Sequence, residues 1–239
     1  MPGLSEASWS DIEAMRAQLA TGAPRSIQQA AEQLAALFAT QFSTVVLARV
    51  FLVLPFERLP PEDSAFVRAA VGDDARLTAR TPILSLLGTH GRLPAWNDRT
   101  RSAGHLAIPL LDRDTVQAAP MIARLLVDLG VDLRGLAAGG PIATRMMIGG
   151  RTAMFYVSDA RTTQDDRGRP IINPEFAAEH GVESVFGMGS SYLDGTIALA
   201  IVFCAERVER AVADRYGSLI NSFKMATLEL KTADRIFAS

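Results

Sequence analysis

The chain has 239 residues, of which 49% are hydrophobic, so it can bury a sizeable core and is not expected to be disordered. Its 24 basic and 26 acidic residues give a net charge of −2, and no basic cluster stands out; this excludes the basic stripe that a nucleic-acid partner requires. The longest apolar runs, Val45–Phe56 and Thr196–Cys204, are too short to cross a membrane as helices, so no membrane partner is expected.

The chain opens with two predicted amphipathic helices. Ser10 and Glu13 fit a capping box for the first helix, and Ser26 with Gln29 opens the second. Apolar residues recur at helical spacing in both. These helices could pack on the core or pair with a second copy of the chain.

A strand, a helix and a second strand follow. Thr44–Leu54 is rich in β-branched residues and apolar on both faces, which predicts a central strand. Pro61–Ala70 has a proline near its start and acids in its first turn, which predicts a short helix. Thr81–Leu87 reads as the next strand, with an end at Gly88.

Helix and strand signals continue in the middle of the chain. Pro120 opens a helix, and the Gly-rich stretch Gly135–Gly150 is typical of a flexible surface excursion. Thr152–Ser158 predicts another strand. Asn173 caps a short helix that ends at Gly181, a complete pair of start and stop signals.

The last third predicts a hairpin and a long helix. Two apolar runs, Ser184–Tyr192 and Thr196–Cys204, meet at Asp194-Gly195, a dipeptide that favours a tight turn because glycine accepts positive φ. Ala205–Lys231 then shows a helical apolar stripe. The antiparallel hairpin favours the α+β class, an antiparallel sheet flanked by helices, over a doubly wound parallel sheet.

Motifs of known chemistry are absent from the sequence. It contains no G-x-x-x-x-G-K-[ST], no G-x-G-x-x-G and no G-x-S-x-G, and its three histidines and single cysteine lack the spacing of a metal site. We therefore predict no catalytic residue and no metal ligand, and no cofactor can be named. The single Cys204 and an N-terminus without a secretory pattern predict a cytoplasmic location.

The segment from His90 to His105 is the richest in polar side chains. An aromatic group that supplies contact area, beside polar groups that fix a ligand, is typical of a binding pocket. Alternatively, the segment is a surface loop pinned by Trp96, with Asp98 paired to Arg99 or Arg101. Phe155 and Tyr156 point to opposite faces of their strand, so at most one can face a pocket. The candidate ligand-binding residues are His90, Trp96, Asn97, Arg99, Arg101, His105 and Tyr156.

The order of elements over about residues 25–230 resembles that of GAF-type sensory domains. The resemblance rests on the strand at Val45–Leu54 after N-terminal helices, the hairpin Tyr192–Phe203 and the helix after it. It implies a cavity for a small molecule between sheet and loops, and a dimer through the terminal helices. The sequence lacks an Asn-Lys-Phe-Asp-like signature of cyclic-nucleotide binders, and Cys204 lies within a predicted strand, so neither a cyclic nucleotide nor a bilin is supported.

These observations predict a helical segment over residues 1–42, a GAF-like sensory core over 43–204 and a C-terminal helix over 205–239. We expect a non-catalytic sensor of an unidentified small molecule that forms a homodimer through residues 8–42 and 205–231. Ligand binding would shift the packing of these helices. Two alternatives stay open: a small-molecule hydrolase with His90 or His105 as general base, and a regulatory module that binds only protein.

Overall fold

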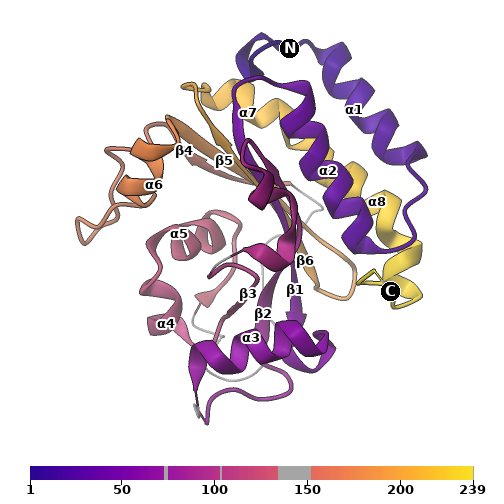
Figure 1. The fold of residues 1–239 in the computed structure, drawn as a ribbon, viewed down its shortest axis with the longest axis vertical. Coiled ribbons are helices and arrows are strands. Elements are labelled where there is room, and N and C mark those ends of the chain that lie inside the picture. Colours follow the sequence, from indigo (N-terminus) through magenta and orange to yellow (C-terminus); the bar gives the residue numbers. More distant parts are fainter. Residues whose placement is uncertain (73–74, 103, 134–151, 239) are drawn as a thin grey trace.

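One antiparallel sheet organises the molecule (Figure 1). The structure is a computed structural model that describes residues 1–72, 75–102, 104–133 and 152–238. Within these ranges six strands pair in the order β3-β2-β1-β6-β5-β4, every neighbour antiparallel. The α+β class predicted from the sequence is confirmed. The strands are β1 Val45–Pro55, β2 Pro82–Gly91, β3 Ala107–Pro109, β4 Ala153–Val157, β5 Ser184–Ser191 and β6 Ile197–Cys204.

The two central strands are the longest apolar runs of the sequence. β1 and β6 are adjacent and almost entirely buried, as a run that is apolar on both faces requires. The predicted hairpin between β5 and β6 is confirmed. Gly195 has a φ of +83°, and the Tyr192 N–H donates to the Thr196 carbonyl over 2.8 Å to close the turn.

Four helices cover one face of the sheet: α1 Trp9–Thr21, α2 Ile27–Gln41, α7 Arg210–Tyr216 and α8 Ser218–Thr232 (Figure 1). Their core is aromatic. The rings of Phe38 in α2, Phe186 in β5 and Tyr216 in α7 contact one another with centroids 5.5 to 6.3 Å apart. The apolar stripes predicted for the terminal helices therefore serve to cover the sheet.

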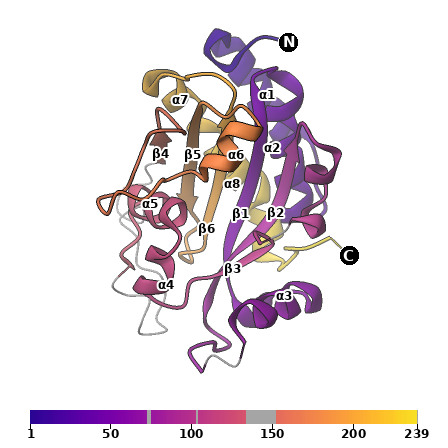
Figure 2. The ribbon, with the colours of Figure 1, turned by 60° about the vertical axis from the view of Figure 1, so that its left-hand side comes forward.

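Shorter elements cover the opposite face (Figure 2). They are α4 Arg113–Gln117, α5 Pro120–Asp128 and α6 Pro174–Glu179, while α3 Pro61–Val71 contacts the edge strand β3. Leu125 and Leu126 of α5 pack with Phe155 of β4 and Leu199 of β6. The sheet thus separates two apolar cores.

The helix starts follow the expected chemistry, with one correction. The capping box of α1 is formed by Ser8 and Asp11, not by Ser10 and Glu13: the Asp11 N–H donates to Ser8 Oγ, and the Ser8 N–H donates back to the Asp11 carboxylate. The same i, i+3 pattern occurs two residues earlier than predicted. Ser26 accepts from the N–H of Gln29 at the start of α2, as expected.

The predicted end of β2 at Gly88 is wrong. The strand continues to Gly91, so His90 lies in regular structure and pairs with Ala48 of β1. Gly88 is needed for a different reason. A Cβ placed there would lie 2.2 Å from the carbonyl carbon of Ala31, so the missing side chain lets the backbone of α2 rest directly on β2.

The remaining predicted elements are present with small changes. Asn173 accepts from two backbone N–H groups at the start of α6, and Gly181 adopts a φ of +66° after its end. The C-terminal helix is present but begins at Arg210 and divides into α7 and α8 at Gly217. The excursion predicted over Gly135–Gly150 lies outside the described residues. No helix in the described ranges combines the length and apolar character that a bilayer span demands.

Candidate functional site

A cavity of about 670 Å³ lies on the sheet face opposite α1, α2 and α8. Its floor is formed by β1 and β6, and its walls by the segment between β2 and β3, the start of α5, and the segment from Pro170 through α6. Cavities of a few hundred to about 1,000 Å³ suit small organic ligands. The size and position therefore make this the candidate binding site.

An aromatic wall forms one side of the cavity. Trp96 comes from the short 3-10 helix Pro94–Asn97, and His180 meets its ring edge-on at 4.7 Å between centroids. Phe176 of α6 contacts His180 at 4.9 Å and Phe203 of β6 at 5.5 Å. All four rings line the cavity, so a ligand would find a large, rigid apolar surface there.

Arg49 is the polar group of the cavity floor. It lies on β1, and its Nη2 is 3.4 Å from the hydroxyl of Ser102, while its Nε is buried with no hydrogen-bond partner among the described residues. Burial lowers the pKa of Arg49 to about 10, so the side chain still carries its positive charge at neutral pH. A second set of basic side chains, Arg101 and His105, lies nearer the solvent.

Buried and local interactions hold the segment that carries Trp96 and Arg101. Arg99 is buried, forms an ion pair with the buried carboxylate of Asp63 in α3, and donates from Nε to the Leu86 carbonyl over 2.6 Å. Asn97 accepts from the N–H of Gly91 over 2.9 Å. The segment is thus fastened to β2 and α3, which fixes the wall of the cavity.

Asp98 caps the short turn that presents Arg101. Its carboxylate accepts from the hydroxyl of Thr100 over 2.7 Å and from the N–H of the same residue over 2.9 Å. These two hydrogen bonds stabilise the ionised form and lower the pKa of Asp98. Asp98 therefore pairs mainly with a threonine rather than with Arg99 or Arg101, the local ion pairs considered from the sequence.

Three of the seven candidate residues line the cavity: Trp96, Arg101 and His105. Asn97 and Arg99 belong to the same segment, but their side chains hold it to β2 and α3. Among the lining residues that the structure describes, neither of these two appears.

His90 and Tyr156 lie on the other side of the sheet. His90 pairs with Ala48, whose side chain belongs to the helix-covered core, and burial lowers the pKa of His90. Tyr156 packs against that same core and donates its hydroxyl to the Val208 carbonyl over 2.7 Å. Of the pair Phe155 and Tyr156, the tyrosine therefore faces away from the cavity.

The sequence analysis missed Arg49, Phe176, His180 and Phe203. A signal for Arg49 exists, because it is the one charged residue in the otherwise apolar run of β1. A charge in a strand buried on both faces needs a polar environment on one of them. The aromatic residues gave no comparable signal, since their meeting depends on how α6 folds over β6.

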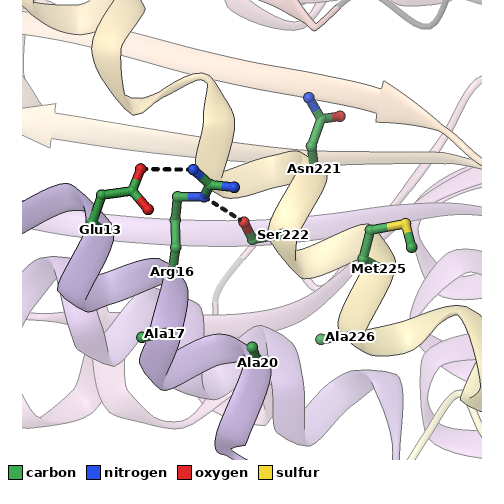
Figure 3. Close-up of a pocket in the computed structure, with 8 residues that line it drawn as sticks. All are labelled: Glu13, Arg16, Ala17, Ala20, Asn221, Ser222, Met225 and Ala226. Atoms are coloured by element: carbon green, nitrogen blue, oxygen red, sulfur yellow. Dashed lines mark hydrogen bonds and ion pairs between the residues drawn. The ribbon is translucent and has the colours of Figure 1, made fainter.

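A second hollow lies between α1 and α8 on the opposite side of the molecule (Figure 3). It measures about 590 Å³ and is lined by small side chains and by Met225. Arg16 crosses it, with Nη1 2.6 Å from Glu13 and Nε 3.1 Å from the hydroxyl of Ser222. The arginine is already paired within the chain, so this groove offers little polar chemistry to a small ligand.

Neither a family model nor a curated protein sequence matches this chain. Solved structures do. The phycocyanobilin-bound GAF domain of a cyanobacterial phytochrome is similar at 10% identity and a TM-score of 0.48, over 95% of this chain and 98% of that one. The GAF domain of an Acinetobacter phosphoenolpyruvate-protein phosphotransferase is similar at 10% and 0.47, over 95% and 96%.

The similarity to these GAF domains concerns architecture alone: an antiparallel six-stranded sheet with helices on both faces and a long C-terminal helix. A free methionine-R-sulfoxide reductase from Neisseria meningitidis in complex with its substrate is also similar, at 14% identity and a TM-score of 0.49, over 95% of this chain and 96% of that one.

The chemistry of the site favours binding. Its lining offers aromatic faces, a buried guanidinium and hydroxyl and imidazole groups, which can orient a ligand. In the ranges that the structure describes, no three His, Cys, Asp or Glu side chains gather as a metal site would need. Cys204 is buried in the helix-covered core, and its burial raises its thiol pKa, so it is not placed to react with a cavity ligand.

Proposed function

We propose that this chain is a non-catalytic sensory domain that binds a small molecule in the cavity between β1, β6 and the Trp96 segment. One observation supports the proposal: a ligand-sized cavity with an aromatic wall and a cationic side chain, Arg49, on its floor. The segment from His90 to His105, identified from the sequence as the richest in polar side chains, supplies part of that wall through Trp96, Arg101 and His105. Sensory domains of this kind act in the cytoplasm, and we assign the chain to that compartment.

The proposal includes a homodimer through α1 and α8. Both helices lie on the face away from the cavity, and both expose large apolar side chains: Trp9 is 61% exposed and Met225 is 67% exposed. Exposed apolar groups on neighbouring helices support a protein interface. Residues along β1 alternate between the cavity floor and the helix-covered core, so a ligand that moves the strand would also shift the helices.

Binding is tested by a thermal-shift screen of metabolites and nucleotides, followed by calorimetry on the compounds that stabilise the protein. The wild type is compared with a Trp96→Ala, Arg101→Ala double variant. A Leu193→Ala, Arg25→Ala double variant is the control, because it removes an apolar and a basic side chain from exposed positions outside the cavity and outside α1 and α8. We expect at least one compound to stabilise the wild type and the control but not the cavity variant. Equal shifts in all three proteins, or no shift in any, would contradict the proposal.

Oligomeric state is tested separately by light scattering coupled to size exclusion. The full chain is expected to run as a dimer, and Met225→Glu, which places a charge on the exposed face of α8, is expected to shift it towards the monomer. The hydrolase alternative now concerns His105, because His90 lies on the other face of the sheet. Turnover in a substrate screen that disappears in His105→Ala would replace the sensor proposal with that alternative.

A further inference from the structure

The position of Arg49 indicates which class of ligand suits the cavity. Arg49 lies in the middle of β1, between the buried Leu47 and Phe51 on the same face of the strand; the residue is half-buried, and its Nε atom is fully buried. No carboxylate in the described part of the chain forms an ion pair with it. An unpaired charge among apolar groups is destabilising unless an opposite charge or several hydrogen bonds reach it.

Part of the hydrogen-bonding capacity around Arg49 is also unused. Its Nε has no partner among the described residues, and neither does the buried hydroxyl of Thr89. Thr89 is the residue directly opposite Arg49 in the pairing of β1 with β2, so the two side chains leave the same face of the sheet side by side. Of the two residues, only Arg49 lines the cavity, and its guanidinium is a donor group suited to an acceptor with two oxygens.

The charges of the side chains that line the cavity favour an anionic ligand. Among the residues that the structure describes, every ionisable side chain that lines the cavity is basic: Arg49, Arg101, His105 and His180. Glu179 lies beside His180, with its carboxylate oxygen 3.8 Å from Nε2, but its side chain is 73% exposed. It therefore faces solvent and does not pair with Arg49. Only Arg49 is deep, so a single negative charge is the balanced choice.

We propose that the ligand is a small organic monocarboxylate with an aromatic or branched apolar body. The carboxylate accepts two hydrogen bonds from the Arg49 guanidinium, and the hydroxyl of Ser102 completes its shell. The apolar body lies against Trp96 and Phe203. This inference rests on the proposed function, since it names the class of ligand for the same cavity.

The test compares acids with neutral isosteres. Benzoate, phenylacetate and indole-3-acetate are titrated by calorimetry beside the corresponding amides and beside phenyl phosphate. Wild type is expected to bind at least one of the acids roughly tenfold or more tightly than its amide, because a hydrogen bond to a charged group is worth more than one between neutral groups. Arg49→Met is expected to lose that preference and bind acid and amide alike, whereas Arg25→Met, at an exposed position, keeps it.

Two further measurements make the test independent of any one variant. Arg49→Lys keeps the charge without the two-pronged geometry, so its affinity for the acid should fall between those of the wild type and Arg49→Met. In the absence of ligand, Arg49→Met should melt at a temperature equal to or above that of the wild type, because an apolar chain replaces an unpaired buried charge.

The outcomes separate the two proposals. Amides that bind as tightly as the acids, with affinity that depends on Trp96, would overturn the carboxylate assignment and leave the sensor proposal standing. Tighter binding of phenyl phosphate than of every acid would overturn the single-charge argument. Absence of binding by all compounds would overturn the carboxylate assignment, and the metabolite screen described above would then decide the sensor proposal on its own.

Discussion

Replacing Gly88 by alanine should be one of the most damaging single-methyl changes in this protein. The added Cβ would lie 2.2 Å from the carbonyl carbon of Ala31, 2.3 Å from its oxygen and 2.5 Å from the nitrogen of Glu32. All three are backbone atoms in the first half of α2, so no side chain can rotate away. Carbon contacts are optimal at about 3.5 to 4.0 Å, so α2 must retreat by roughly 1 Å or more.

The magnitude follows from what α2 buries. Six of its side chains, from Ile27 to Phe38, are buried against the sheet and its neighbours. A radial gap of about 0.5 to 1 Å already forfeits a quarter to a half of the dispersion energy of each contact. Overpacking of a rigid core typically costs about 1 to 3 kcal/mol, and the absence of a flexible neighbour places Gly88→Ala at the upper end, about 3 kcal/mol.

Gly189→Ala is the matched control. Gly189 also lies in a buried strand, but its added Cβ would meet only the ends of the Leu129 side chain, 2.9 Å from Cδ2. That side chain can turn aside, so the change should stay within about 1 kcal/mol. Urea unfolding followed by circular dichroism measures both variants. A loss for Gly88→Ala no greater than that for Gly189→Ala would refute the close approach of α2 to β2.

The other predictions concern interactions that stabilise the cavity wall and the helical layer. Arg99→Met should lower the free energy of unfolding by about 3 to 5 kcal/mol, because it leaves Asp63 buried without its partner; the double variant with Asp63→Leu should recover most of that loss in the same urea assay. Asp98→Asn keeps an oxygen acceptor but does not titrate. Because the pKa of Asp98 is lowered in the folded state, its ionised form stabilises wild type above the ordinary pKa of 3.8, and this contribution disappears as the pH falls through the folded value. Wild type should therefore lose its advantage over Asp98→Asn in thermal melts below about pH 4, and a constant difference would count against the assignment. Tyr216→Phe removes a buried hydroxyl that donates to the Leu4 carbonyl over 2.8 Å, so it should cost about 1 to 2 kcal/mol in urea unfolding, and no change would mean that the N-terminal segment is not held there.

Most of the fold could be predicted from local patterns in the sequence. The turn at Asp194-Gly195 and the cap at Asn173 depend on a few neighbouring residues, so the sequence pattern was enough to place them. The end of β2 was wrong for the opposite reason. A glycine at this position can end a strand or allow a helix to pack closely on it. Which of the two applies to Gly88 depends on Ala31, which is far away in the chain. The short edge strand Ala107–Pro109 was likewise not expected, since its pairing with β2 decides it.

The candidate site was only partly predictable. Trp96, Arg101 and His105 reach the cavity because a compact polar segment stays together in space, which its composition could indicate. Arg99 belongs to the same segment, but its buried partner Asp63 comes from α3, and no spacing rule reveals such a pair. Arg49 was not predicted as a site residue, because the sequence does not show that one face of β1 borders a cavity while the other packs against helices.

The alternation along β1 has a consequence for how the protein can diverge. Arg49 and Phe51 contact the cavity side, whereas Ala48, Val50 and Leu52 contact the helices. Successive residues of one strand are therefore under different constraints, one set by the lining of the cavity and the next by packing against the helices. Substitutions at every second position could alter the cavity without changing the helical layer.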